Sequence, residues 1–143
     1  MKIAICGSLT FAKEMGQLKT ELNKLSHKVV LPYSARQILT GEYSGAKIEQ
    51  AKNKGTFYKL VIINDAIRRW YKVIKRSDGI LVANFDKKKI KNYIGGNAFL
   101  EMGFAHILRK KIFLLNPIPD VSYKDEILAM QPKLLNGDLS KVT

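Results

Sequence analysis

The segment from Gly95 to His106 combines a glycine turn with one carboxylate, an arrangement that could do chemistry. The open backbone at Gly95 and Gly96 lets a ligand approach closely, and the start of the following helix offers unpaired N–H groups to an anion. Glu101 falls in the first turns of that helix, where the positive end of the helix dipole favours an ionised carboxylate. Such a group can act as a nucleophile or stabilise a cation. The alternative is an acidic residue that only stabilises a helix start.

The apolar segments that must position this glutamate alternate between strand and helix patterns. We expect strands at Lys2–Cys6, Lys28–Pro32, Ile80–Asn84 and Lys111–Leu115, with a last edge strand at Lys133–Leu135. We expect helices from about Phe11 to Leu25, Tyr58 to Ser77, Asn97 to Leu108 and Asp125 to Met130. This alternation predicts an α/β protein with a parallel sheet of four to five strands, formed by one domain over residues 1–143.

The least regular part of the chain runs from Tyr33 to about Phe57. Gly41, Gly45 and Gly55 interrupt two weakly helical stretches there. We therefore expect an insertion that flanks or covers a pocket.

Small and polar residues follow the carboxyl ends of the predicted strands. Gly7 and Ser8 follow the first strand, Asn84 and Asp86 follow the third, and the segment Gly95–Glu101 opens the helix after it. Ligands of open parallel sheets bind beyond these strand ends, near the point where the strand order reverses. The sequence therefore predicts that these groups converge on one site.

Several of these residues have two alternative roles. Ser8 could bind a phosphate or sugar, or it could cap the first helix. Asn97 could cap the helix that carries Glu101, with a ligand contact as the second reading. Tyr93 is a candidate for stacking on a nucleobase, whereas Trp70 is expected to be buried. The candidate substrate-binding residues are Gly7, Ser8, Asn84, Tyr93, Gly95, Gly96 and Asn97.

The formal net charge of +13 calls for a separate explanation. Basic residues cluster at Lys72/Lys75/Arg76, at Lys87–Lys89 with Lys91, and at Arg109–Lys111. Such a surface attracts polyanions and steers phosphorylated ligands. No helix-turn-helix, zinc-finger or RNA-binding motif accompanies the charge. A lysine-rich solvated surface is therefore favoured over nucleic-acid binding.

Composition limits which other classes of protein the chain can belong to. The 143 residues, 46% of them hydrophobic, suffice for one core, and no stretch is long and apolar enough to cross a bilayer. The single cysteine, Cys6, excludes an internal disulfide and favours a cytoplasmic setting, where buried packing is its expected role. Two histidines and one cysteine do not make a zinc site, and we expect neither a metal nor a cofactor.

Three short motifs resemble the nucleoside 2-deoxyribosyltransferase family, which includes the 2′-deoxynucleoside 5′-phosphate N-hydrolases. They are Cys6-Gly7-Ser8, Asp78-Gly79-Ile80-Leu81-Val82-Ala83 and Glu101-Met102-Gly103-Phe104-Ala105, and the similarity runs from about Met1 to Leu115. The resemblance implies a flavodoxin-like (Rossmann-like), doubly wound parallel sheet in a three-layer α/β/α arrangement. It also implies cleavage of the bond between a deoxyribose and its base, and homo-oligomers that complete each site.

The same resemblance assigns roles by position. Glu101 would be the nucleophile that attacks the anomeric carbon, and Gly7 and Ser8 would line the sugar or phosphate pocket. Breaking an N-glycosidic bond builds positive charge on the sugar, which an ionised carboxylate stabilises. The leaving base also needs a proton, so a second acid is expected, for which Asp65 and Asp86 are the candidates.

This chain departs from the family pattern at three positions. The family often has a tyrosine two residues before the cysteine, where this chain has Ala4. Six residues before the nucleophile, nucleoside-accepting members tend to have aspartate and nucleotide-accepting members serine, whereas this chain has Gly95. The family's helix carboxylate falls at the position of Trp70. These departures predict altered substrate recognition.

A second resemblance concerns Gly95-Gly96 followed by Glu101, which is similar to the glycine-glycine…glutamate motif of the cytokinin riboside monophosphate phosphoribohydrolases. Both resemblances imply cleavage or transfer at the N-glycosidic bond of a nucleoside or nucleoside 5′-monophosphate. The alternatives are a non-catalytic nucleotide-binding module and, below it, a basic nucleic-acid-binding protein.

Overall fold

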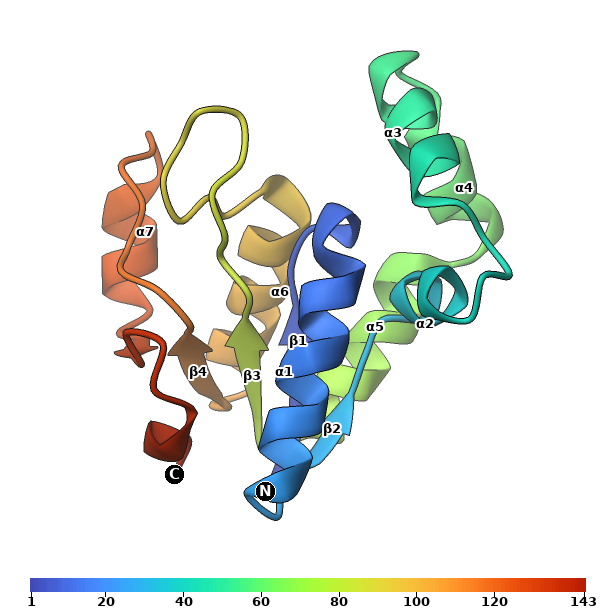
Figure 1. Ribbon diagram of the computed structural model, residues 1–143. Helices are drawn as coiled ribbons and strands as arrows, with labels where there is room; N and C mark the ends of the chain where they lie inside the picture. Colours follow the sequence, from blue (N-terminus) through green and yellow to red (C-terminus); the bar gives the residue numbers. More distant parts are fainter.

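Five parallel strands form one sheet in the computed structural model, which describes residues 1–143 (Figure 1). The strands are β1 (Lys2–Cys6), β2 (Lys28–Val30), β3 (Gly79–Val82), β4 (Lys111–Leu114) and β5 (Lys133–Leu134). They are ordered β2-β1-β3-β4-β5, so the chain winds outward in both directions from the β1–β3 pair. In register, Ala4 of β1 lies between Val30 and Ile80. The expected doubly wound, flavodoxin-like α/β fold is confirmed.

Helices cover both faces of the sheet because successive strand residues point to opposite sides. Ile3 and Ile5 pack with α1 (Ala12–Lys24) on one face. Ala4 and Cys6 pack on the other face with α5 (Ala66–Lys75), α6 (Gly96–Ile107) and α7 (Lys124–Ala129). Figure 1 shows α1 in front of the sheet and α6 behind it, which makes three layers.

Helix α1 follows directly from the apolar spacing of its sequence. Met15, Leu18 and Leu22 recur at three- and four-residue intervals and are buried against the sheet. A short 3₁₀ turn, Leu9–Phe11, precedes the helix and is capped by the Ser8 hydroxyl, which accepts from the backbone N–H of Thr10. The predicted helix is confirmed to within one residue at each end.

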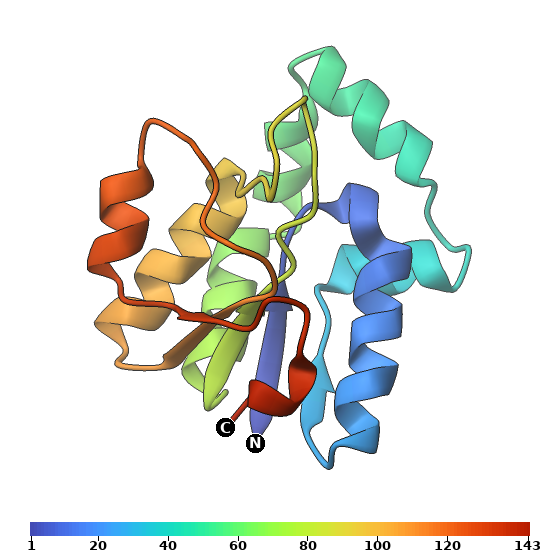
Figure 2. The same ribbon diagram turned by 60° about the vertical axis from the view of Figure 1, so that its left-hand side comes forward.

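The expected insertion consists of three short helices beside the sheet. They are α2 (Tyr33–Leu39), α3 (Gly45–Asn53) and α4 (Phe57–Ile63). Gly41 and Gly55 follow α2 and α3 with φ of 76° and 67°, a left-handed conformation that glycine adopts without strain. In Figures 1 and 2, α3 and α4 rise above the edge where the strand arrows end.

The single long helix expected from Tyr58 to Ser77 is wrong. The chain instead forms α4 and α5, which are separated at Asn64 and Asp65. The Asn64 side chain donates to the Leu60 carbonyl at 2.9 Å, and Asp65 adopts φ 45°, a left-handed conformation that asparagine and aspartate tolerate better than most residues. Helix α4 has no buried residue, so no contact with the sheet holds the two segments in line.

The remaining segments agree with the sequence pattern. The lysine-rich stretch between β3 and α6 is a loop, and a second 3₁₀ turn, Leu139–Lys141, closes the chain near the N-terminal ends of the strands. None of the helices combines the length and the apolar character that crossing a membrane requires.

Candidate active site

A pocket opens at the carboxyl ends of β1 and β3, where the strand order reverses. Gly7 and Ala83 follow these two strands and approach so closely that a Cβ added to Gly7 would lie 3.2 Å from the Ala83 carbonyl oxygen. The pocket has two adjoining halves, and four residues line both of them: Gly7, Leu9, Phe57 and Asn97. Ligands of doubly wound sheets bind at this topological position.

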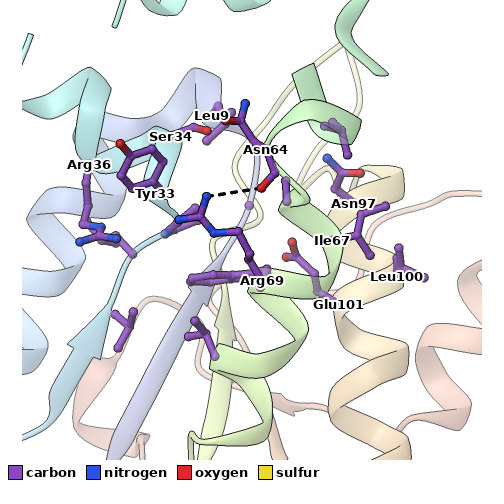
Figure 3. Close-up of a pocket in the computed structure, with 18 of the residues that line it drawn as sticks. Leu9, Tyr33, Ser34, Arg36, Asn64, Ile67, Arg69, Asn97, Leu100 and Glu101 are labelled. Carbon is purple, nitrogen blue, oxygen red and sulfur yellow. Dashed lines mark hydrogen bonds between the residues drawn. The ribbon is translucent and has the colours of Figure 1, made fainter. Parts of the chain in front are cut away.

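The first half, here called the apolar half, has a volume of about 220 Å³ and mostly hydrophobic walls. It lies between the residues after β2, the break between α4 and α5, and α6. Its polar side chains are Tyr33, Ser34, Arg36, Asn64, Arg69, Asn97 and Glu101. Figure 3 shows Arg69 and Glu101 reaching into this half from neighbouring helices.

Glu101 lies in the second turn of α6 and is half-buried. Burial raises the pKa of its carboxyl group from 4.5 to about 7, while the nearby Cys6 thiol and Trp70 indole act in the opposite direction. The expectation that the helix dipole keeps this group fully ionised is therefore not met, because desolvation outweighs it. At neutral pH the carboxyl group is divided between its two forms.

Cys6 and Trp70 form the floor beneath this carboxylate. The Cys6 thiol is fully buried, and its pKa is raised well above the ordinary value, first by burial and then by the charge of Glu101. Trp70 is also buried, as expected, and its Nε1 has no hydrogen-bond partner. The indole lies near Glu101 without the geometry of a hydrogen bond, so this buried donor would be satisfied by a small shift of the carboxylate.

The second half of the pocket, here called the basic half, has a volume of about 380 Å³. It is lined by Lys52 of α3, by Lys87 and Lys88 of the loop after β3, and by Gly95–Ala98 at the start of α6. In Figures 1 and 2 this loop rises on the same edge of the molecule as α3 and α4.

Lys87 joins three separate segments around the basic half. Its Nζ donates to the hydroxyl oxygens of Ser8 and Thr10, both at 2.8 Å, and lies 3.5 Å from the Glu49 carboxylate. Glu49 accepts a hydrogen bond from Thr10 at 2.6 Å, which lowers the pKa of its carboxyl group more than the neighbouring lysines do. Glu49 therefore stays ionised and balances one of the surrounding cations.

Positive charge remains in excess around this half of the pocket. Lys52 has a pKa below its ordinary value because it is buried and because Lys87 and Lys88 lie nearby, despite its ion pair with Glu49 at 3.7 Å. The start of the twelve-residue helix α6 adds unpaired N–H groups to the same wall. The cavity therefore suits an anion, because three cations and a helix start surround it and only one carboxylate offsets their charge.

Asp86, one of the two candidate second carboxylates, lies outside the pocket. It is exposed and accepts a hydrogen bond from the backbone N–H of Asn92 at 2.8 Å, which closes the base of the lysine-rich loop. Within this loop Lys88 and Lys89 have φ of 52° and 60°, a costly conformation for residues other than glycine. Asp86 thus helps to hold a strained loop that presents Lys88 to the pocket.

Asp65, the other candidate, also lies outside the pocket. It is exposed at the break before α5 and pairs with Arg68 at 3.2 Å. Asn64, one residue earlier, lines the apolar half. Glu101 is therefore the only carboxylate in the apolar half, and the chain itself offers no second acid there.

The expected substrate-binding residues divide into two groups. Gly7, Ser8, Tyr93, Gly95, Gly96 and Asn97 line the pocket. Asn84 is buried outside it, and its side chain joins the loops after β3 and β4, donating to the carbonyls of Asn116 and Pro117 and accepting from the Asn116 N–H. Since both polar atoms of its side chain already have hydrogen-bond partners, Asn84 holds the loops after β3 and β4 in position.

Two details refine the expected roles within the pocket. Asn97 is the second residue of α6, so it does not cap the helix and its side chain is free to face a ligand. A Cβ added to Gly95 would lie 3.2 Å from the Tyr93 ring. The absence of a side chain at Gly95 therefore allows Tyr93 to pack against the start of α6.

Searches against protein-family models, curated proteins and solved structures gave no significant match to this chain. The functional assignment must accordingly come from the geometry and chemistry of the pocket.

Several residues that line this pocket were not predicted from the sequence. The missed side chains are Tyr33, Arg36, Glu49, Lys52, Phe57, Arg69 and, as site residues, Lys87 and Lys88. Tyr33 and Arg36 come just after β2, so the rule that placed residues after the other strands could have included them. No local pattern marks Glu49, Lys52 or Arg69, because they reach the pocket only through the arrangement of the insertion and α5.

Proposed function

We propose that this protein cleaves or transfers at the N-glycosidic bond of a nucleoside 5′-monophosphate, with Glu101 as the nucleophile. The observation that carries the proposal is the position of Glu101: its carboxylate lines the apolar half of the pocket, and the basic half adjoins that half at Gly7 and Asn97. A sugar above Glu101 would extend its base into the first half and its 5′-phosphate into the second. The resemblance to the nucleoside 2-deoxyribosyltransferase family supports the same reaction.

The environment of Glu101 suits a nucleophile that must attack and later leave. A carboxyl group with a pKa of about 7 is ionised in a substantial fraction at neutral pH, and it is more basic than an exposed glutamate. Its charge in a poorly solvated pocket stabilises the positive charge that develops on the anomeric carbon. The covalent sugar–glutamate ester would then be released by water or by a second base.

The basic half favours nucleotides over nucleosides. Lys52, Lys87 and Lys88 surround a cavity that already contains Ser8 and the start of α6, whereas only Glu49 offsets their charge. A phosphate there would receive charge-assisted hydrogen bonds from groups already in place. This arrangement would compensate for Gly95, which stands where nucleotide-accepting members of the family that the chain resembles tend to have serine.

The main alternative is a nucleotide-binding module without catalysis. It is favoured by one specific observation, namely that neither Asp65 nor Asp86 reaches the pocket to act as the second acid. Both proposals predict nucleotide binding, and only the first predicts release of a free base.

The decisive experiment incubates the purified protein with deoxyribo- and ribonucleosides and their 5′-monophosphates and measures free base by chromatography. We expect base release from at least one monophosphate, faster than from the matching nucleoside, and loss of release in Glu101→Gln. Thermal stabilisation by a monophosphate without any base release would support the binding module instead. Release that persists at the wild-type rate in Glu101→Gln would exclude the nucleophile.

We also propose that a second copy of this chain covers the mouth of the apolar half. The helices that border the apolar half, α4, α5 and α6, carry large apolar side chains that a lone molecule would leave in water: Ile62, Ile63, Ile67, Leu100 and Ile107. Ile67 and Leu100 also line the pocket, so a partner seated there would complete the wall. Light scattering should give a dimer or larger assembly, and Ile63→Asp should shift it to the monomer.

A further inference from the structure

Two arginines line the apolar half of the pocket around one aromatic ring. The guanidinium carbons of Arg36 and Arg69 lie 5.5 Å and 5.2 Å from the centroid of the Tyr33 ring. Arg36 belongs to α2 and Arg69 to α5, so the cluster brings together the residues after β2 and the helix that precedes β3. Figure 3 shows all three side chains in the pocket that also contains Glu101.

Neither arginine has a carboxylate partner, and the ion pairs of the chain all lie elsewhere. Arg69 donates one hydrogen bond, to the Asn64 carbonyl at 3.4 Å, which leaves most of its five N–H donors free. Glu101 shares the pocket with Arg69, but the charge of Arg69 is not among the causes that shift the pKa of its carboxyl group. The cation and the carboxylate thus face the same space without pairing.

The apolar half also contains no side chain that is placed to protonate a leaving base. Its only carboxyl group is Glu101, which the proposed reaction uses as the nucleophile. The Tyr33 hydroxyl accepts a hydrogen bond from Gln37 at 3.3 Å and points away from Glu101 in Figure 3. Arginine cannot serve as the acid because it does not lose its proton in proteins.

We propose that Arg36 and Arg69 are catalytic residues that stabilise the departing base as an anion, in place of a proton donor. This inference rests on the proposed function. As Glu101 attacks the anomeric carbon, the bond from that carbon to the base nitrogen breaks and its electron pair remains on the base. The guanidinium groups donate hydrogen bonds to the acceptor atoms that share this charge, while the Tyr33 ring holds both cations in place.

The proton balance then closes through water. The base leaves as an anion bound by the arginines, and the sugar remains as an ester of Glu101. Water attacks the anomeric carbon, the carboxylate is released, and the proton that this water loses ends on the base. No second carboxylate is required in this sequence, which agrees with the exposed positions of Asp65 and Asp86.

The test compares substrates whose bases depart with different charge. Deoxyguanosine 5′-monophosphate loses guanine as an anion unless the base is protonated, whereas its 7-methyl derivative loses a neutral base. We expect Arg69→Gln to lower kcat/KM by about 10²–10³-fold on the first substrate, the usual cost of one charge-stabilising donor, and by less than about tenfold on the second. For pyrimidine bases, deoxyuridine 5′-monophosphate and its 5-fluoro derivative both lose an anion, but the fluorinated anion is the weaker base, so Arg69→Gln should lower kcat/KM less on the fluorinated substrate.

Arg68→Gln is the matched control, since Arg68 lies on the same helix but lines neither half of the pocket and pairs with Asp65. Arg36→Gln should repeat the selective loss. An equal loss of kcat/KM on both members of a substrate pair would overturn the proposal, because it would mean a structural role. Selective loss in Tyr33→Phe but not in Arg69→Gln would also overturn it, by assigning proton donation to the tyrosine.

The outcomes separate this inference from the function on which it rests. If the wild-type protein releases a base from none of these four substrates and from no other nucleoside 5′-monophosphate, the proposed reaction itself fails. If it cleaves one and Glu101→Gln abolishes that cleavage, the reaction stands, and the substrate-pair comparison alone decides the role of the arginines.

Discussion

The ammonium group of Lys87 donates a hydrogen bond to the Ser8 hydroxyl at 2.8 Å, although 79 positions separate the two residues in sequence. This bond ties the loop after β3 to the turn after β1, directly across the switch point of the sheet. Glu49 of the insertion lies against the same ammonium group. Three segments are therefore locked together before any ligand binds, and an arriving anion would meet donors that need little reorganisation.

Lys88 provides the sharpest test of the basic half. It lines the pocket, forms neither an ion pair nor a hydrogen bond within the chain, and has its ammonium group 5.6 Å from the centroid of the Tyr93 ring. Its removal should therefore leave the hydrogen bonds and ion pair around Lys87 intact. We expect Lys88→Gln to weaken binding of a nucleoside monophosphate about tenfold or more, the usual value of a hydrogen bond to a charged group, without weakening binding of the nucleoside. Calorimetric titration of both ligands measures this.

Lys91→Gln is the matched control, because Lys91 lies in the same loop, is exposed and lines neither half of the pocket. Equal weakening by the two variants would indicate a general effect of net charge rather than a phosphate contact.

The rate of base release should follow the ionisation of Glu101. In the proposed reaction the carboxylate form attacks, so kcat/KM should rise with pH around the pKa of about 7 and level off above it. Because arginine does not titrate in this range, we expect no second, descending limb up to about pH 9. A rate that is already constant from pH 5 upwards would contradict the burial of this carboxyl group.

The indole N–H of Trp70 should shift the pH dependence of base release. It favours the ionised form of Glu101, so Trp70→Phe should raise the pKa of the carboxyl group and move the midpoint of the pH profile upwards. The indole nitrogen has no hydrogen-bond partner to lose, but the smaller phenyl ring leaves space in the buried cluster, so the free energy of unfolding should fall by about 1 kcal/mol or more. Kinetics from pH 5 to 9 and urea unfolding together distinguish tuning of the carboxyl group from damage to the core.

Glu101 should also make stability depend on pH. Its pKa is higher in the folded chain than in the unfolded chain, so the folded state binds more protons between about pH 4.5 and 7, and stability falls as pH rises through this window. The total loss is about 3 kcal/mol at most. Glu101→Gln should therefore stabilise the protein at pH 8 but not at pH 4.5, as measured by urea unfolding at both values.

Gly95 and Gly96 offer a matched pair for testing the glycine turn. A Cβ at Gly95 meets the Tyr93 ring at 3.2 Å, whereas a Cβ at Gly96 meets nothing within 4 Å. We expect Gly95→Ala to lower the melting temperature by about 2–4 °C, corresponding to about 1 kcal/mol of strain, and Gly96→Ala to leave it unchanged or raise it. Restoration of the melting temperature when Tyr93→Leu is combined with Gly95→Ala would identify the ring as the source of the strain.

Much of the fold was readable from the sequence because its strands and main helices are strongly patterned. The fully buried run Ile80–Val82 and the leucine spacing of α1 each have one physical interpretation. The break at Asn64 and Asp65 was not predicted, because the apolar residues of α4 continue the spacing of α5 although they face solvent. Periodicity detects an apolar face but cannot tell whether anything covers it.

Part of the site could also be predicted from the sequence. Glu101, Gly7 and Ser8 lie at strand ends or at a helix start, positions that the order of elements fixes in advance. The behaviour of Glu101 was not predicted, because its pKa is raised by burial, which depends on how distant parts of the chain pack around it. The roles of Asp65 and Asp86 as the second acid stay predictions that the geometry does not favour, since both are exposed.

The break before α5 separates two groups of pocket residues, one on helices that form the core and one on the insertion. Glu101 and Trp70 stand on helices whose buried faces hold the sheet together, so their positions are constrained by folding itself. Glu49, Lys52 and Phe57 come from the insertion, which ends at the left-handed turn of Asp65. Substitutions in the insertion can therefore change which ligand is accepted without disturbing the core. The nucleophile and the selectivity of the basic half can thus evolve on separate parts of the chain, whereas Arg36 ties the apolar half to the insertion.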